Sequence, residues 1–378
     1  MLIIKNGFKL FCNNLIFNLI ACITLGVASI MVAVSSVYVA SSTEYLNAAK
    51  KFNEQGLVYL SAVADEGDVV TEFKKEDFEN AIDVHRMYNG ALKVNGKIAN
   101  VSAYDEFFMA LHDFDIKGRL PVVGANEVLA SGDVALGDKL SIDIKGVITE
   151  KKVVGILNEN SLLIYGQTTS DNIVGLENLF RKFDLTTLSV GIVLPIEDIS
   201  TIELKYFDRN IFVRYDNNYL TENKNQILGK LTEKARAVIF DDQYNYSKNV
   251  YKEESTIFIV VLMVSLLAGL AMVLTNIIML FTTKIKYFAT LYLNGYSIKN
   301  IVSLTLVYVS IMAIISCLIS LIALSLVLKT MFPGFENVRL LSILLPFAFS
   351  LGVAIVGVIT IFIITKKINL AEKIGKTE

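Results

Sequence analysis

Four long stretches without a Lys, Arg, Asp, Glu or His side chain constrain this chain more than any other feature. They are Leu10–Thr43, Ser255–Thr283, Asn300–Leu328 and Leu340–Thr365. Each is longer than the roughly 20 apolar residues that cross about 30 Å of hydrocarbon as a helix. Because every backbone polar group must be satisfied inside a bilayer, the sequence predicts four transmembrane helices.

The charged residues are concentrated in one part of the chain. Residues 41–254 contain 24 Lys and Arg and 34 Asp and Glu, whereas the remaining residues contain 11 and 3. Only 19% of the 378 residues are charged, against about 25% in an ordinary soluble domain. We therefore expect a membrane protein with one large domain in water.

The first apolar stretch follows Lys5 and Lys9, as the core of a signal peptide would. It is too long for such a core, and the best cleavage candidate, Tyr38-Val39-Ala40, begins with a bulky residue. We therefore expect an uncleaved membrane anchor.

Basic residues predict the orientation, because cytoplasmic loops carry an excess of Lys and Arg. Met1–Lys9, Lys284–Lys299 and Lys366–Glu378 together contain nine Lys and two Glu. The sequence thus predicts a multi-pass protein of the bacterial cytoplasmic (inner) membrane, with both termini inside. The predicted boundaries are an amphipathic helix at 1–14, transmembrane helices at 15–40, 255–283, 300–328 and 340–365, an outer domain with helical stalks at 41–254, a cytoplasmic helix at 284–299, an outer loop at 329–339 and a cytoplasmic tail at 366–378.

The outer domain is expected to be an inserted α/β domain, so the fold class is an α-helical membrane domain plus an α/β extracytoplasmic domain. Its three-dimensional structure must rest on an apolar core, because Cys12, Cys22 and Cys317 all lie in or beside membrane segments. Absence of cysteine from this domain favours a bacterial surface. The expected helices are Lys75–Asn89 and Asn223–Ala237, the latter capped by Asn223, and the expected strands are Leu57–Val63, Lys139–Ile144, Lys152–Leu157, Gly191–Leu194 and Asn210–Tyr215, with Gly132–Leu157 as a small antiparallel unit.

The stalks are expected at Ser41–Phe52 and Asp241–Glu254; a loose linker is an equal alternative for the second. The N-terminal helix is expected to lie on the inner membrane surface, with a simple extension of the first span as the alternative.

No motif for catalysis or cofactor binding is found. The nearest approach to a phosphate-binding loop, Gly90 to Gly96-Lys97, has one residue too many. His85 and His112 are not spaced as metal ligands and are expected to make hydrogen bonds or lie at the surface. The acidic outer domain gives nucleic-acid binding no electrostatic support. We expect no enzyme activity, no metal and no cofactor in this chain.

The order of one span, a large outer domain and three further spans resembles the FtsX/MacB-type (type VII, mechanotransmission) permeases of ABC transporters. Three local resemblances accompany it. The first is Lys5-Asn6-Gly7-Phe8-Lys9 with Thr24-Leu25-Gly26. The second is the ordered series Gly118-Arg119-Leu120-Pro121, Asn126-Glu127-Val128, Leu136-Gly137-Asp138-Lys139 and Val153-Val154-Gly155-Ile156-Leu157, which is similar to stations of the MacB-like core domain. The third is Phe288-Ala289-Thr290-Leu291 followed by Gly295-Tyr296-Ser297.

The resemblance implies that residues 284–299 form a coupling helix that contacts a separate ABC ATPase, where ATP and Mg would bind. The implied contact residues are Lys284, Lys286, Tyr287, Phe288, Leu291, Tyr292, Gly295, Tyr296 and Ser297. A second permease chain, identical or different, is also implied and would complete a dimer. Tyr287 and Tyr292 replace charged residues that are usual in the family, and a different second chain that carries those charges is one alternative. Further expected partners are membrane lipids and an extracytoplasmic protein. The alternative for this segment is a membrane-surface anchor with no partner.

The implied function is the ATP-driven export or extraction, including efflux, of a peptide, lipoprotein, lipid or amphiphilic drug. An alternative is a regulatory membrane protein that controls a cell-wall hydrolase or a sensor and transports nothing. A third is a receptor or enzyme that works without ATP.

Overall fold

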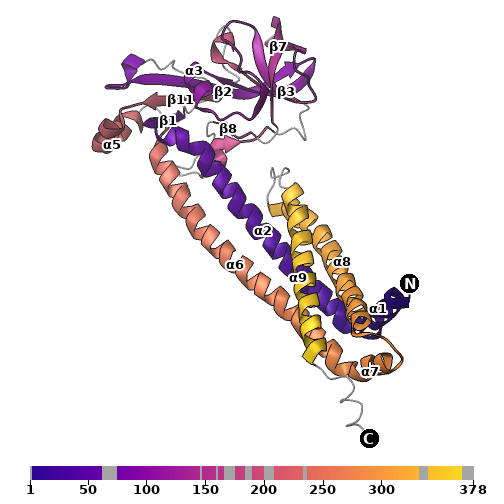
Figure 1. Cartoon of the computed structure of the whole chain (residues 1–378). Helices are drawn as coiled ribbons and strands as arrows, with labels where there is room; N and C mark the ends of the chain where they lie inside the picture. Colours follow the sequence, from indigo (N-terminus) through magenta and orange to yellow (C-terminus); the bar gives the residue numbers. More distant parts are fainter. Residues whose placement is uncertain are drawn as a thin grey trace. The chain divides into compact units, whose positions relative to one another are not determined.

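The computed structural model describes residues 2–61, 75–144, 147–158, 161–165, 175–183, 190–199, 208–232, 236–331 and 339–367. The chain divides into two compact units, a helical unit (1–41 and 253–378) and a strand-rich unit (42–252). Each is described by itself (Figure 1).

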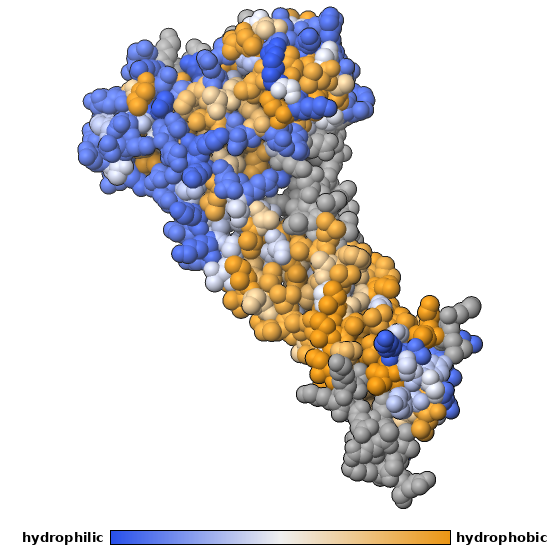
Figure 2. All heavy atoms as spheres, viewed as in Figure 1, coloured by the Kyte–Doolittle hydropathy of each residue, from blue (hydrophilic) through white to orange (hydrophobic). Residues whose placement is uncertain are grey.

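The helical unit contains four helices that are long and apolar enough to cross a membrane, and this confirms the prediction of four candidate spans. The helices of this unit are α1 (Leu2–Asn13), α2 (Leu15–Asn53), α6 (Phe240–Thr283), α7 (Ile285–Leu293), α8 (Ile298–Met331) and α9 (Arg339–Lys367). Hydrophobic residues cover most of the visible surface of the helical unit, whereas hydrophilic residues cover most of the strand-rich unit (Figure 2). An apolar outer surface on a helix is what contact with lipid tails requires.

The N-terminal helix α1 is separate from the first candidate span, because α1 ends at Asn13 and α2 begins at Leu15. Leu10 and Phe11 are buried in the core of the helical unit, while Lys5 and Lys9 are exposed. Gly7 lies so close to α8 that an added Cβ would stand 2.7 Å from Val307 Cγ1. The helix therefore packs through the face that contains Gly7, Leu10 and Phe11, whereas the apolar side chains of Ile4 and Phe8 are exposed.

The strand-rich unit is built on one mixed sheet. Ten strands of the described residues form it, in the order β12-β1-β11-β2-β3-β10-β5-β7-β4, with β6 pairing both β2 and β7. Its strands are β1 (Leu57–Ser61), β2 (Asp83–Val94), β3 (Lys97–Tyr104), β4 (Ile116–Gly118), β5 (Glu127–Gly132), β6 (Lys139–Ile144), β7 (Val147–Leu157), β10 (Val190–Pro195), β11 (Asp208–Arg214) and β12 (Arg236–Ile239). Strands β8 (Leu163–Ile164) and β9 (Phe180–Arg181) form a separate pair.

Part of this sheet closes on itself. Strands β2, β3, β10, β5, β7 and β6 pair in succession, and β6 returns to β2 through Lys93–Asp143 and Val94–Ile142. The interior is filled by small and branched apolar side chains such as Val101, Ala130 and Ile192. Closure removes free strand edges over this part of the sheet.

The remaining strands, β11, β1 and β12, extend the sheet beyond the closed part. One face packs against α5 (Asn217–Thr232) through Leu220, Ile227 and Leu231. The other face packs against α3 (Glu106–Leu111) and against Phe52 of α2 and Phe240 of α6. Three short helical segments complete the unit: α4 (Leu176–Leu179) and the 3-10 turns η1 (Lys75–Asp77) and η2 (Ile196–Ile199).

The predicted strands are confirmed as β1, β6, β7, β10 and β11, and the antiparallel pairing of β6 with β7 confirms the predicted unit. Both predicted stalk segments are helical, as parts of α2 and α6.

The predicted helix at Lys75–Asn89 is wrong. Only η1 is helical there, and β2 begins at Asp83. Asn80 adopts a positive φ of 60°, which ends the helical turn, and β2 then pairs with β3 and β11. Pairing with strands distant in sequence outweighs the local helical propensity.

The predicted helix at Asn223–Ala237 is wrong at both ends. Its N-terminal cap is Asp216, whose Oδ1 accepts hydrogen bonds from the Asn218 and Tyr219 amides at 2.9 and 3.2 Å. Asn223 instead lies at a kink inside α5, and Ala237 belongs to β12. Most of the predicted outer loop 329–339 and of the predicted tail 366–378 lies outside the described residues.

Candidate functional site

The first candidate site is α7, because most residues of the predicted coupling helix lie on it. Lys284 interrupts the helical backbone between α6 and α7, with φ −112° and ψ 17°. Phe288 is fully buried, and its ring stacks on Phe281 of α6 with 5.0 Å between the ring centroids. Helix α7 is therefore packed against the core of the helical unit through Phe288.

Three of the predicted contact residues face inward. Phe288 belongs to the buried core, and Tyr287 and Leu291 are half-buried against that core. Partial burial also raises the pKa of the Tyr287 phenol. These side chains hold the helix against the core of the helical unit.

The outward surface of α7 contains Lys286, Thr290 and Leu293, which are spaced by four and three residues and so share one face. Tyr292 is 39% exposed and Leu293 is 66% exposed. Thr290 and Leu293 were not among the predicted contact residues. Their helical spacing from Lys286 is the signal that could have found them.

The C-terminal end of α7 is closed by a Schellman turn. The Tyr296 amide donates to the Leu291 carbonyl at 3.0 Å, and the Gly295 amide donates to the Tyr292 carbonyl at 3.1 Å. Gly295 has a φ of 88°, in the left-handed region that favours glycine. The glycine thus sets the direction in which the chain leaves α7.

Ser297 follows this turn and directly precedes α8. Its Oγ accepts a hydrogen bond from the Asn300 amide at 3.3 Å, and its carbonyl accepts one from the same amide at 2.9 Å. Ser297 is therefore an N-terminal cap. Residues 284–299 contain three lysines and no acidic residue, so this surface is positively charged. We name the exposed residues Lys286, Thr290, Tyr292, Leu293, Asn294 and Ser297 the α7 surface.

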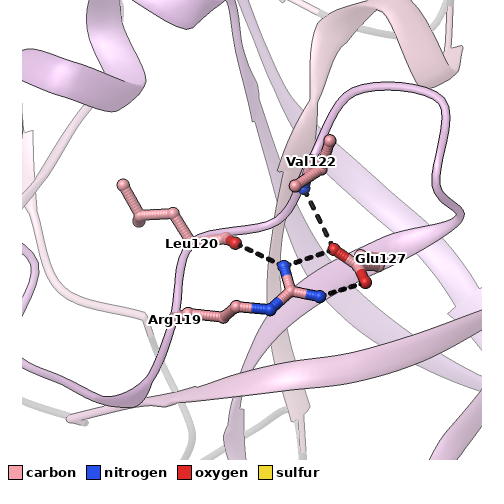
Figure 3. Close-up of polar contacts among 4 residues, drawn as sticks. All are labelled: Arg119, Leu120, Val122 and Glu127. Atoms are coloured by element: carbon pink, nitrogen blue, oxygen red, sulfur yellow. Dashed lines mark hydrogen bonds and ion pairs between the residues drawn. The ribbon is translucent and has the colours of Figure 1, made fainter.

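The second candidate site lies in the strand-rich unit, where the structure brings the four resembling motifs together. Arg119 and Glu127 form an ion pair in which both guanidinium nitrogens Nη1 and Nη2 donate to the carboxylate (Figure 3). The Val122 amide donates to Glu127 Oε2 at 3.1 Å, and Arg119 Nη1 donates to the Leu120 carbonyl at 3.0 Å (Figure 3). Residues 119–127 therefore form a closed loop.

This ion pair also sets the charge of the loop. The hydrogen bond from Arg119 is the main cause that lowers the pKa of the Glu127 carboxyl, and the Glu127 carboxylate raises the pKa of Arg119. Both groups are therefore charged across the physiological range of pH.

The glycines of these motifs permit a close approach of backbones. A Cβ on Gly118, whose φ is 123°, would stand 2.5 Å from the Val154 carbonyl oxygen and 2.8 Å from Leu136 Cδ1. A Cβ on Gly155 would stand 2.7 Å from the Arg119 carbonyl oxygen. The Gly137 amide donates to the Val153 carbonyl at 2.8 Å. Residues from all four motifs are thus in contact.

The two histidines make hydrogen bonds, as predicted. His85 Nδ1 lies 2.9 Å from Asp105 Oδ2, and His112 Nδ1 lies 2.7 Å from the Phe108 carbonyl oxygen. Among the residues that the structure describes, no group of three or more His, Cys, Asp and Glu side chains is placed to hold a metal ion.

The fold and sites together define a protein with four apolar helices long enough to cross a membrane and a separate strand-rich domain. Comparison with models of known protein families finds no match, and comparison with curated proteins finds none either.

Proposed function

We propose that this chain is the permease subunit of an ABC transporter of the FtsX/MacB type. In this proposal a separate ATPase binds ATP and Mg, and its movements displace the strand-rich domain, which lies outside the bacterial cytoplasmic membrane. The cargo would be a peptide, lipoprotein, lipid or amphiphilic drug. A second permease chain would complete the transporter.

The observation that carries the proposal is the α7 surface. It combines a positive charge with the exposed side chains of Tyr292 and Leu293, and the buried Phe288 fixes it from the other side. Exposed aromatic and apolar side chains with polar ones around them are typical of a protein contact. An ATPase surface with acidic and apolar groups would be complementary to it.

Two features support force transmission from this surface. Helix α6 is continuous from Phe240 to Thr283 and precedes α7 by one residue. At its other end, Phe240 is buried in a core of the strand-rich unit together with Phe52 of α2. A continuous helix that is held at both ends transmits a displacement along its axis.

The clustering of the four motifs in the strand-rich unit supports the family resemblance. Motifs that follow one another in a sequence need not touch in the fold. Here Gly118, Leu136 and Val154, from three of the motifs, lie side by side. Arg119 and Glu127, from two of the motifs, form an ion pair.

The test is affinity purification of the tagged full-length protein in mild detergent, with mass spectrometry of the proteins that accompany it. We expect a Walker-motif ATPase in near-equal amount. Leu293→Asp, which adds a carboxylate to the α7 surface, should remove the ATPase. Ile98→Asp makes the same change at an exposed residue of β3 in the strand-rich unit and should retain it.

Two results would contradict the proposal. One is the recovery of a monodisperse protein without any ATPase. The other is an ATPase that Leu293→Asp and Ile98→Asp affect equally, because the contact would then not involve the α7 surface.

A further inference from the structure

Helix α1 carries exposed apolar side chains beside exposed basic ones. Ile4 and Phe8 are 64% and 58% exposed, and because they are four residues apart they form one stripe along the helix. Lys5 and Lys9 are exposed as well. Each follows an apolar residue of the first stripe, so the two lysines form a second stripe next to it. We name these four residues the outer face of α1.

Another side of α1 holds the helix in the helical unit. Leu10 and Phe11 are buried in the core of this unit, and the centroid of the Phe11 ring lies 6.2 Å from that of Tyr308 in α8. The Phe11 carbonyl accepts a hydrogen bond from Asn18 Nδ2 of α2 at 2.7 Å. These contacts fix α1 on α2 and α8 while the outer face remains exposed.

The direction of α1 differs from that of the candidate span next to it. Helix α1 is turned away from the axis of α2, which begins two residues after α1 ends (Figure 1). The first residues of α2, Leu15, Ile16 and Phe17, are apolar and exposed. A helix that joins the end of a membrane span at an angle lies at the level of the lipid headgroups. The exposed apolar surface of the candidate span thus continues to the end of α1.

The charge of the outer face is complementary to anionic headgroups. Helix α1 contains two lysines and no acidic residue. In the described part of the chain, neither lysine forms an ion pair. Basic side chains beside an apolar stripe are typical of helices that lie in the membrane interface and are attracted to anionic lipids. The aliphatic part of a lysine lies along an apolar surface while its ammonium group reaches the headgroups.

We propose that the outer face of α1 binds anionic phospholipids. Ile4 and Phe8 lie between the acyl chains, and the ammonium groups of Lys5 and Lys9 contact the headgroup phosphates. A bilayer fits this face better than a protein does, because the apolar surface continues onto a candidate span, where acyl chains are the expected neighbours. This inference does not rest on the proposed function, since it concerns α1 and not the α7 surface.

The first experiment locates the outer face by fluorescence. The chain contains no tryptophan, so Phe8→Trp introduces a single probe. The full-length variant is reconstituted into vesicles of phosphatidylcholine and phosphatidylglycerol, and the probe is quenched by acrylamide from water or by lipids with brominated acyl chains. We expect strong quenching by the lipids and weak quenching by acrylamide. Ile4→Trp repeats the measurement on the same stripe.

Two further variants calibrate this measurement. Val264→Trp places the probe at an exposed residue of the candidate span α6 and is the control for contact with acyl chains. Ile98→Trp places it at an exposed residue of β3 and is the control for contact with water.

The second experiment measures the preference for the anionic headgroup. The lipid composition is held constant, and the bromine is placed either on phosphatidylglycerol or on phosphatidylcholine. The ratio of the two quenching efficiencies should be higher for Phe8→Trp than for Val264→Trp, by up to about fivefold for each lysine. Adding Lys5→Gln and Lys9→Gln should lower the ratio to the value for Val264→Trp.

The matched control for the loss of charge is the pair Lys93→Gln and Lys97→Gln. It removes two exposed lysines, also four residues apart, from the strand-rich unit, and it should leave the ratio for Phe8→Trp unchanged.

Two results would overturn the proposal. Acrylamide quenching of Phe8→Trp as strong as that of Ile98→Trp would place the outer face in water, where a protein could cover it. A ratio that stays the same when Lys5 and Lys9 are replaced would show that these lysines do not select anionic lipids.

Discussion

Tyr308 of α8 donates a hydrogen bond through its hydroxyl to Oδ1 of Asn18 in α2. Both side chains are buried, and they lie 290 residues apart in the sequence. Asn18 Nδ2 in turn donates to the Phe11 carbonyl of α1 at 2.7 Å. One asparagine therefore joins three helices within an otherwise apolar core.

This network predicts a measurable coupling between Asn18 and Tyr308. Tyr308→Phe leaves Asn18 Oδ1 without its partner and should lower the free energy of unfolding by about 1 kcal/mol. A double-mutant cycle with Asn18→Leu should give a coupling of about 0.5 to 1.5 kcal/mol, the range for hydrogen bonds between membrane helices. Unfolding of the detergent-solubilised protein measures it. Tyr292→Phe, at an exposed tyrosine, should be neutral, and additive effects at Asn18 and Tyr308 would contradict the network.

Substitutions at Gly295 should weaken the proposed ATPase contact in a defined order. Among the described residues, no atom lies within 4 Å of a Cβ added to Gly295. The cost therefore comes from the positive φ, about 1–2 kcal/mol for an ordinary residue. Asn tolerates this region better than Ala. ATPase recovery should therefore fall from Gly to Asn to Ala, and Gly295→Asp, which adds a carboxylate to the turn, should abolish it without preventing membrane insertion.

Gly352→Ala is the matched control for this series. Gly352 also has open space around its Cβ, but it lies within α9. Copurification of the ATPase should be unchanged in this variant. Equal recovery for Gly295→Ala and Gly352→Ala would show that the Schellman turn does not matter for the contact.

The candidate spans could be predicted from the sequence, because a long run of apolar residues is a local property. Strand β6 could be predicted for a related reason, since alternation along a few residues determines which side is buried. Strand β10 could be predicted because it is a short apolar run, and all but one of its residues are buried. The prediction of a helix at Lys75–Asn89 was wrong because the structure of this segment depends on residues distant in the sequence. Arg86 of β2 pairs with Ile211 of β11, and no local pattern shows that pairing.

The division of α7 into an inner and an outer face could not be predicted either. Tyr287, Phe288 and Tyr292 are all aromatic and within six residues of one another, yet Phe288 is buried and Tyr292 is exposed. The difference depends on where Phe281 of the preceding helix lies. The order of the glycine-containing motifs could be seen in the sequence. The contacts between these motifs could be seen only in the three-dimensional structure.

The Arg119–Glu127 ion pair should hold the loop between these two residues in one conformation. Arg119→Lys cannot form two parallel hydrogen bonds with the carboxylate, and Glu127→Gln removes the charge that both Arg119 and the Val122 amide contact. We expect faster hydrogen exchange at the Val122 amide in both variants, with little change in global stability because Arg119 is exposed. Lys139→Gln breaks the exposed pair with Glu150 and is the control. Unchanged exchange at Val122 in Glu127→Gln would show that the pair does not hold the loop.

His112 should make the strand-rich unit less stable in mild acid. Its ring is buried between Phe114, at 4.7 Å, and Phe52, at 5.1 Å. Nδ1 lies against the Phe108 carbonyl, and Nε2 accepts from the Ile164 amide at 3.1 Å. With one donor and one acceptor the imidazole is neutral. Burial lowers the pKa of His112 from 6.5 to about 4, an effect that the bond to Phe108 only partly opposes.

The sign of the effect follows from proton binding. Between pH 6.5 and about 4 the unfolded chain binds a proton at His112 that the folded chain does not. The free energy of unfolding therefore falls as the pH decreases through this window, by up to about 1.4 kcal/mol per pH unit and about 3 kcal/mol in total. Above pH 6.5 this contribution is fully present and constant.

Hydrogen exchange of the full-length protein measures this loss of stability, in peptides that cover β3 and α3. The rates are corrected for the intrinsic effect of pH on exchange. Protection should decrease from pH 7 to pH 5 in the native chain. His112→Gln, which has no titrating group, should show a smaller decrease whatever its absolute stability. An equal decrease in both proteins would assign the acid sensitivity to other groups, because the slope with pH reports the proton at His112 and not the packing of its ring.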